Sequence, residues 1–218
     1  YTKLIPKPMV SINNKPIIYH IMKHFSNYGY KDFYILLGYK GKIIKDYFKK
    51  KNLNWNIKLI DTGKNTMTGG RILRLKKYFS KNENFFMTYG DGVSDINLKK
   101  LKEFHEKHNK IATVTAVRPP IRFGELNVGN NNIVKKFEEK PQLKSGWING
   151  GFFILNYKVF KYIKNDNTLF EREPMEKLAK RKNLIAYKHS GFWKCVDTLK
   201  DKLFLEEIYK KNKKKWIK

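Results

Sequence analysis

An apolar stretch of the sequence, FFMTYGDGVSDIN at residues 85–97, ends in two acidic side chains. Asp91 lies between Gly90 and Gly92, and Asp95 follows shortly after them. A carboxylate here could hold a divalent cation, because Mg²⁺ prefers hard oxygen ligands. Asp91 could equally be a turn residue that caps the next helix. The pattern DINLKKL is typical of a helix start, so Asp95 is expected to be a helix cap.

Other residue types that often carry chemistry give weaker signals. The five histidines do not recur at the spacing of metal ligands, so the sequence assigns them no role. Cys195 is the single cysteine, which excludes an internal disulfide and favours a packed or incidental thiol.

The chain is strongly basic, with 47 Lys and Arg against 19 Asp and Glu and a net charge of +28. Such a balance often indicates a nucleic-acid partner. Here, however, the lysines are scattered among asparagines, as in KKKNLNWNIK, and do not gather on one helix. A basic polyanion-binding module is therefore the least favoured hypothesis, and no specific nucleic acid is expected. The tail YKKNKKKWIK at residues 209–218 is expected to be a solvated end.

The hydropathy of the chain indicates neither a membrane span nor a secretion signal. No apolar run reaches the roughly 18 residues that a membrane helix needs, and YTKLIPKPMV lacks the apolar centre of a signal peptide. A cytoplasmic protein without a membrane partner is expected.

The elements that must position Asp91 alternate between strand and helix patterns. Residues 15–29 place Ile17, Ile21 and Phe25 on one helical stripe, with Gly29 as a stop. Strands are expected at 32–39, 56–63, 84–91, 111–118 and 149–156, helices at 40–50, 69–80, 97–109, 171–183 and 198–211, and a hairpin around GNNN within 123–141.

This alternation predicts a single α/β domain over residues 1–218, with a Rossmann-like mixed, mostly parallel sheet flanked by helices and small β-hairpin embellishments. Ligands of open α/β sheets bind at the carboxyl ends of the strands. Asp91 follows such an end, and the glycines on both sides of it would let a ligand approach the backbone closely.

Several short motifs occur in one order along the chain: IPKPMVSINNKPII, DTGKNTMTGGRI, FFMTYGDGVSD, RFGEL, FEEKP, WINGGFFILN and GFWKCVDTLKD. Each is weak alone, but the ordered set closely resembles the sugar-phosphate nucleotidyltransferases over nearly the whole chain. TMTGGR and WINGGFF resemble the glucose-1-phosphate cytidylyltransferases in particular. The resemblance implies a nucleotide-diphospho-sugar transferase fold.

The resemblance also implies a reaction in which CTP and α-D-glucose 1-phosphate give CDP-glucose and pyrophosphate with Mg²⁺ as cofactor. Such an enzyme serves nucleotide-sugar biosynthesis, for example for O-antigen or another surface polysaccharide. Because the second pKa of a sugar phosphate is near about 6, its oxygen is already a nucleophile at neutral pH. The main barrier is charge repulsion between two polyanions, which calls for a cation held by carboxylates and for well-placed lysines.

Matching the motifs assigns roles to residues. Asp91 and Asp197 fall on the family's metal-binding aspartates, and Asp91 also belongs to the nucleotide site. Lys7 matches the lysine that contacts the phosphates. Lys140 matches the lysine that holds the sugar phosphate, and Glu139 beside it matches a ligand of sugar hydroxyls.

Two further groups of residues match binding loops of the family. The sugar pocket corresponds to Gly124, Asn149, Gly150 and Trp193. The loop that meets the pyrimidine corresponds to Thr68, Gly69 and Gly70, where backbone groups could read the cytosine edge. Turn geometry, a helix N-terminus and, for Trp193, a core position remain the alternatives.

The chain departs from the family pattern in two places. The family's glycine-rich loop, of the form GGxGTRL, would precede Tyr1, so the domain is expected to be N-terminally incomplete as given. The connection after Phe48, KKKNLNW, is shorter than in the cytidylyl enzymes. A relative that uses UTP or dTTP and a catalytically inactive homologue therefore remain alternatives, and a homo-oligomer is expected.

Overall fold

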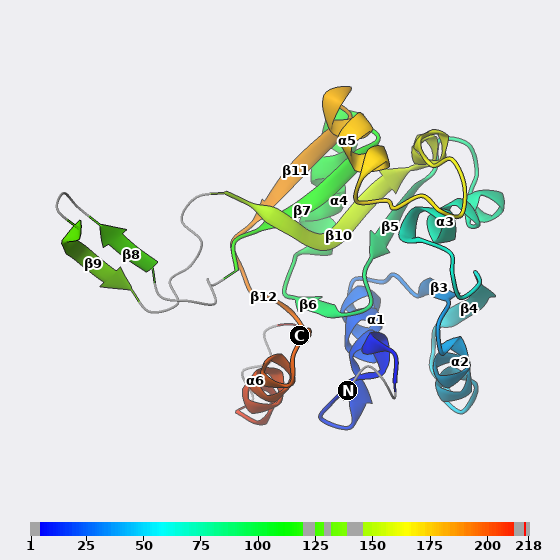
Figure 1. The fold of residues 1–218 in the computed structure, drawn as a ribbon. Coiled ribbons are helices and arrows are strands. Elements are labelled where there is room, and N and C mark those ends of the chain that lie inside the picture. The colour runs from blue at the N-terminus through cyan, green and yellow to red at the C-terminus, as the bar shows by residue number, and fades with distance from the viewer. Residues whose placement is uncertain (1–4, 120–124, 129–131, 139–145, 212–215, 217–218) are drawn as a thin grey trace.

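The computed structural model describes residues 5–119, 125–128, 132–138, 146–211 and 216. Its largest sheet has four strands in the order β11-β7-β10-β5 (Figure 1). Strands β5, β7 and β11 run in one direction, and β10 runs against them. The predicted mixed sheet is thus confirmed: three of its four strands share one direction, although two of the three pairings are antiparallel. The bounds are Asn84–Thr88 for β5, Ala112–Val117 for β7, Ile148–Asn156 for β10 and Leu184–His189 for β11.

Strand β10 divides the core in two, because successive side chains of a strand point to opposite faces. Phe152 and Ile154 pack with α1 (Ile17–Asn27), α4 (Leu98–His108) and α6 (Leu199–Lys210) on one face. Phe153 and Leu155 pack on the other face with α5 (Glu173–Lys180) and the 3₁₀ helix Tyr157–Tyr162. The sheet is therefore covered by helices on both faces, as the alternating pattern predicts.

Helix α1 follows its sequence pattern closely. Ile17, Ile21 and Phe25 are buried at 0%, 5% and 5% exposure. The helix ends at Asn27, and Gly29 then adopts φ +88°, a left-handed conformation that glycine accepts readily. The predicted helix and its glycine stop are confirmed.

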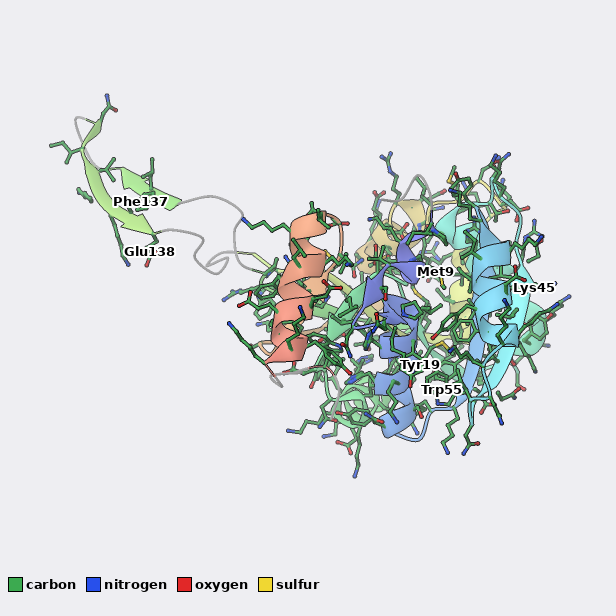
Figure 2. All side chains as sticks on the ribbon, turned by 90° about the horizontal axis from the view of Figure 1, so that it is seen from below. Met9, Tyr19, Lys45, Trp55, Phe137 and Glu138 are labelled. Carbon is green, nitrogen blue, oxygen red and sulfur yellow. The ribbon has the colours of Figure 1, made fainter. Side chains whose placement is uncertain are left out.

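A second, two-stranded parallel sheet lies beside the first. It pairs β3 (Asp32–Leu37) with β4 (Asn56–Asp61), and α2 (Gly41–Lys49) connects them. Within the described residues, no strand joins it to the four-stranded sheet. The short connection after Phe48 is largely exposed but is anchored at its end by Trp55. Trp55 Nε1 donates to Ser26 Oγ over 2.9 Å, and the ring lies 5.4 Å from that of Tyr19, centroid to centroid (Figure 2).

Smaller elements complete the chain. The predicted hairpin forms from β8 and β9 and projects from the rest of the molecule (Figure 2). The bounds are Ser11–Ile12 for β1, Lys15–Pro16 for β2, Gly92–Ser94 for β6, Glu125–Val128 for β8, Val134–Glu138 for β9, Trp193–Cys195 for β12, Thr68–Leu73 for α3, and Lys7–Met9 and Lys76–Tyr78 for two 3₁₀ helices. No helix in the described ranges is long and apolar enough to span a bilayer.

Two local predictions are wrong. Asn97 caps α4, because its side chain accepts a hydrogen bond from the backbone N–H of Lys100 over 3.0 Å. Asp95 instead lies 3.0 Å from His189 Nε2. The tail is not wholly solvated, since Trp216 is only 1% exposed and stacks on Phe192 with the ring centroids 5.4 Å apart. Burial of the Trp216 ring is favourable even within a basic sequence, because it removes a large apolar surface from water.

A pair of histidines, of which His105 is buried and His108 is half-buried, joins α4 to β7. The Thr113 hydroxyl lies 2.8 Å from both His105 Nδ1 and His108 Nε2, so it can donate to one ring and accept from the other. Burial lowers the pKa of His105 to about 4. The native state therefore holds this imidazole neutral.

We expect the protein to lose stability in acid through His105. A folded-state pKa below the ordinary value means that this stability is fully present above about pH 6.5 and is lost as the pH falls towards 4 and below. The loss is up to about 3 kcal/mol of unfolding free energy. Urea unfolding at several pH values, with His105→Gln as the comparison, measures it. An equally steep acid loss in His105→Gln would contradict the assignment.

Candidate active site

The two predicted metal-binding aspartates lie side by side. Asp91 connects β5 to β6, and Asp197 follows β12. Strands β6 and β12 are antiparallel, with Gly92 opposite Cys195, and the pairing continues where Val196 N–H donates to the Asp91 carbonyl over 2.9 Å. A strand follows Asp91, so the alternative that it caps a helix is wrong.

Lys7 completes this cluster from the beginning of the chain. Its Nζ lies 2.7 Å from Asp197 Oδ1 and 3.5 Å from Asp91 Oδ2. The hydrogen bond to Asp197 raises the pKa of Lys7 and lowers the pKa of the Asp197 carboxyl. Three charged groups that are far apart in sequence therefore meet at one edge of the structure. We call Lys7, Asp91 and Asp197 the charged cluster.

Gly90 allows a close contact within the protein. A Cβ at this position would lie 2.7 Å from Pro8 Cγ, so glycine lets the Lys7–Met9 turn approach the end of β5. At Gly92 a Cβ would meet nothing closer than 3.9 Å. The close approach at Gly90 thus brings Pro8, the neighbour of Lys7, against the end of the strand. The approach of a ligand to these glycines stays a prediction.

Asp197 also has a sulfur neighbour. Cys195 Sγ donates to Asp197 Oδ2 over 3.2 Å. Burial and the nearby carboxylate raise the pKa of the thiol to about 12. The thiol therefore stays protonated and acts as a hydrogen-bond donor to Asp197, a role that a single cysteine in the sequence does not reveal.

The charged cluster suits a divalent cation that keeps much of its hydration. Asp91 and Asp197 offer carboxylate oxygens, and their side chains are 29% and 38% exposed. No group of three or more His, Cys, Asp or Glu residues among the described ones could enclose a metal by itself. Mg²⁺ typically takes one or two carboxylates together with waters and substrate phosphates, so this donor set fits it.

Three of the residues matched to the sugar pocket lie together. Trp193 Nε1 donates to the Gly150 carbonyl over 2.6 Å, which ties β12 to β10. Asn149 precedes Gly150 and accepts the Gly151 N–H over 2.8 Å. A Cβ at Gly150 would lie 2.8 Å from Val117 Cγ1, so the packing on β7 requires this glycine. Gly124, Glu139 and Lys140 lie outside the described residues.

The loop matched to the pyrimidine begins α3. Gly69 N–H donates to the Thr168 carbonyl over 2.9 Å, so this amide already has a partner within the protein. Added Cβ atoms would lie 2.7 Å from that carbonyl at Gly69 and 2.5 Å from Asp166 Cα at Gly70. These two glycines therefore let α3 pack on the segment around residues 166–168.

A hydrogen-bonded bridge that the sequence reasoning missed connects the two loops. Glu171 accepts hydrogen bonds from Tyr89 Oη over 2.7 Å and from Thr68 Oγ1 over 2.6 Å. Asn149 Nδ2 donates to Tyr89 Oη over 3.4 Å. Burial is the main cause of a pKa of Tyr89 well above its ordinary value, so the phenol remains a donor. In the sequence, only the position of Tyr89 directly before the GDG motif could have pointed to this bridge. No motif pointed to Glu171.

Arg71 is a second residue without an assigned role. Its guanidinium donates to the Leu37 carbonyl, to Thr62 Oγ1 and to the Lys64 carbonyl. It therefore fixes α3 to the ends of β3 and β4. The motif TMTGGR contains Arg71, but only the fold shows what it contacts.

Comparison with known proteins agrees with this geometry. A family model described as nucleotidyl transferase matches residues 1–211. The glucose-1-phosphate cytidylyltransferase of Salmonella typhimurium is 45% identical over 233 residues, covering 97% of this chain and 90% of the relative. The probable glucose-1-phosphate cytidylyltransferase of Bacillus subtilis is 41% identical, covering 99% and 92%. Both alignments are longer than the 218-residue chain, so these relatives carry residues that it lacks.

Solved structures show the same fold. HddC from Yersinia pseudotuberculosis, complexed with GMP-PN, has a TM-score of 0.74 at 26% identity and covers 94% of this chain and 90% of its own. A UDP-glucose pyrophosphorylase complexed with UDP-glucose has a TM-score of 0.72 at 21% identity, covering 97% and 92%.

Proposed function

Because the chain belongs to the nucleotidyl transferase family, we propose that it transfers a cytidylyl group from CTP to α-D-glucose 1-phosphate. The products are CDP-glucose and pyrophosphate. The observation that carries the proposal is the 45% identity over 97% of the chain to a glucose-1-phosphate cytidylyltransferase, together with the charged cluster at the matching motifs.

In the proposed reaction, a phosphate oxygen of glucose 1-phosphate attacks the α-phosphorus of CTP. A new P–O bond forms, and the bond from the α-phosphorus to the oxygen bridging to the β-phosphate breaks, so that pyrophosphate leaves with that electron pair. No general base is needed, because the sugar phosphate is mostly a dianion at neutral pH. The protein must therefore bring two anions together and stabilise the negative charge that they share.

Lys7 is suited to the charge-stabilising role. Its pKa is raised, so it remains an ammonium ion throughout the neutral range. Asp91 and Asp197 would hold a divalent cation, for which we propose Mg²⁺. When bound, the cation would reduce the repulsion between the phosphates.

The remaining assignments follow from the family resemblance. Lys140 is proposed to bind the phosphate of the sugar, and Glu139 to bind sugar hydroxyls, with Gly124, Asn149, Gly150 and Trp193 around them. Thr68, Gly69 and Gly70 are proposed to contact the pyrimidine. A cytoplasmic location and a homo-oligomeric state also remain predictions.

Offering the purified full-length protein CTP, UTP and dTTP in turn, each with glucose 1-phosphate and Mg²⁺, tests the proposal. We expect CDP-glucose by mass spectrometry and a kcat/KM for CTP that exceeds the others by on the order of 100-fold or more, because a site that bonds the cytosine amino group leaves polar groups unpaired with uracil or thymine. Equal use of UTP or dTTP would contradict the nucleotide assignment. No turnover with any nucleotide would favour an inactive homologue.

A further inference from the structure

We propose that Asp201 is a positioning residue that holds Asp197 in place within the charged cluster, an inference that rests on the proposed function. Asp201 is the third residue of α6, and its sequence context, TLKD, reads as an ordinary helix start. Only 8% of the residue is exposed. Buried carboxylates need partners, so its contacts indicate what it does.

Both carboxylate oxygens of Asp201 are occupied. Oδ2 accepts from Thr198 N–H over 2.9 Å, from Thr198 Oγ1 over 2.8 Å and from Asp197 N–H over 3.2 Å. Oδ1 lies 2.5 Å from Lys194 Nζ. Although burial opposes it, the hydrogen bonds from Lys194 and Thr198 lower the pKa of Asp201 to about 2. The group is ionised at neutral pH.

Capping of α6 accounts for only part of this arrangement. The capping box consists of the two reciprocal bonds between Thr198 and Asp201. The bonds to Asp197 N–H and Lys194 lie outside the box, and both lead back to the charged cluster. Lys194 belongs to β12 and pairs with Val93 of β6, the strand that follows Asp91.

These contacts hold Asp197 from both sides. On its N-terminal side, Val196 N–H donates to the Asp91 carbonyl, which fixes the backbone to the partner aspartate. On its C-terminal side, Asp201 holds the Asp197 N–H. The Asp197 carboxylate, 2.7 Å from Lys7 Nζ, is thereby oriented toward the cluster. Groups that orient metal ligands in this way typically contribute about 10- to 100-fold in metal affinity.

The experiment titrates Mn²⁺ alone into the purified protein and follows the free ion by electron paramagnetic resonance. We expect Asp201→Ala to raise the Kd for Mn²⁺ about 10-fold and to lower kcat at subsaturating Mg²⁺, with partial recovery at high Mg²⁺. Asp201→Asn retains an acceptor oxygen and should restore part of the affinity. If Asp201→Ala does not fold, the Kd for Mn²⁺ is measured in Asp201→Asn instead.

Asn97→Ala is the matched control, because it removes the cap of α4 and leaves the charged cluster untouched. It should lower Tm but leave the Kd for Mn²⁺ unchanged. A parental Kd in both Asp201 variants would overturn the proposal, and so would an equal weakening in Asn97→Ala, which would indicate general instability. Asp197→Asn tests the proposed function separately, since a parental Kd in that variant would overturn the metal role itself.

Discussion

Replacing either Asp91 or Asp197 with asparagine is expected to abolish most of the turnover while the fold is retained. Each substitution exchanges a carboxylate for an amide of nearly the same size, so packing is conserved. What is lost is a negative charge beside the other aspartate and Lys7. The proposed cation would then be held by one carboxylate. A loss of kcat on the order of 1,000-fold is expected, comparable with the removal of one preorganised group from a charged transition state.

The measurement is steady-state pyrophosphate release at saturating CTP and glucose 1-phosphate, with thermal unfolding in parallel. Asp32→Asn is a matched control, because Asp32 is an exposed carboxylate at the start of β3, where it accepts a hydrogen bond from Asn56 Nδ2 over 2.8 Å. Its kcat should be close to the parental value. Near-parental rates in both Asp91→Asn and Asp197→Asn would remove these residues from the proposed mechanism.

Replacing Lys7 with methionine is expected to lower kcat by about 100- to 1,000-fold. Methionine keeps the length of the side chain but has no charge. The ammonium ion that would stabilise negative charge on the phosphates is lost, whereas the two carboxylates remain. Since Lys7 now neutralises Asp91 and Asp197, its removal should leave the affinity for Mn²⁺ equal or higher.

This combination separates a catalytic role of Lys7 from a structural one. Weaker Mn²⁺ binding together with lower kcat in Lys7→Met would show that Lys7 mainly organises the aspartates. Lys177→Met is the control for loss of a surface lysine, because Lys177 pairs with Glu173 one turn away on α5 and is 46% exposed. Its kcat and Mn²⁺ affinity should both match the parent.

The sequence by itself determined the elements whose pattern is local. The apolar periodicity of α1, the apolar runs of β3, β5 and β7 and the GNNN motif in the sequence between β8 and β9 each predicted the observed element. The position of Asp91 after β5 also followed from the sequence, because a strand end is marked where an apolar run stops at glycine. The proposed roles of Asp91, Asp197 and Lys7 came from the family resemblance of the ordered motifs, and the three side chains lie together in the structure.

Strand β11 and the burial of Trp216 were decided by tertiary packing. Residues 184–189 alternate weakly, and their strand forms because β7 offers a parallel edge. Trp216 lies within a basic tail and is buried because His20 and Phe192 surround it. Local sequence preferences cannot predict such contacts, since the stabilising partner lies far away in the sequence.

The supporting residues of the site were likewise visible only in three dimensions. Asp201 reads as a helix cap, Glu171 as a surface acid and Cys195 as an incidental thiol until the fold brings them to Asp197, Tyr89 and Thr68. A side chain's type limits which bonds it can make, whereas its partner depends on how distant strands pair. The sequence therefore determined which groups could do the chemistry, and the tertiary structure decided which residues hold them in place.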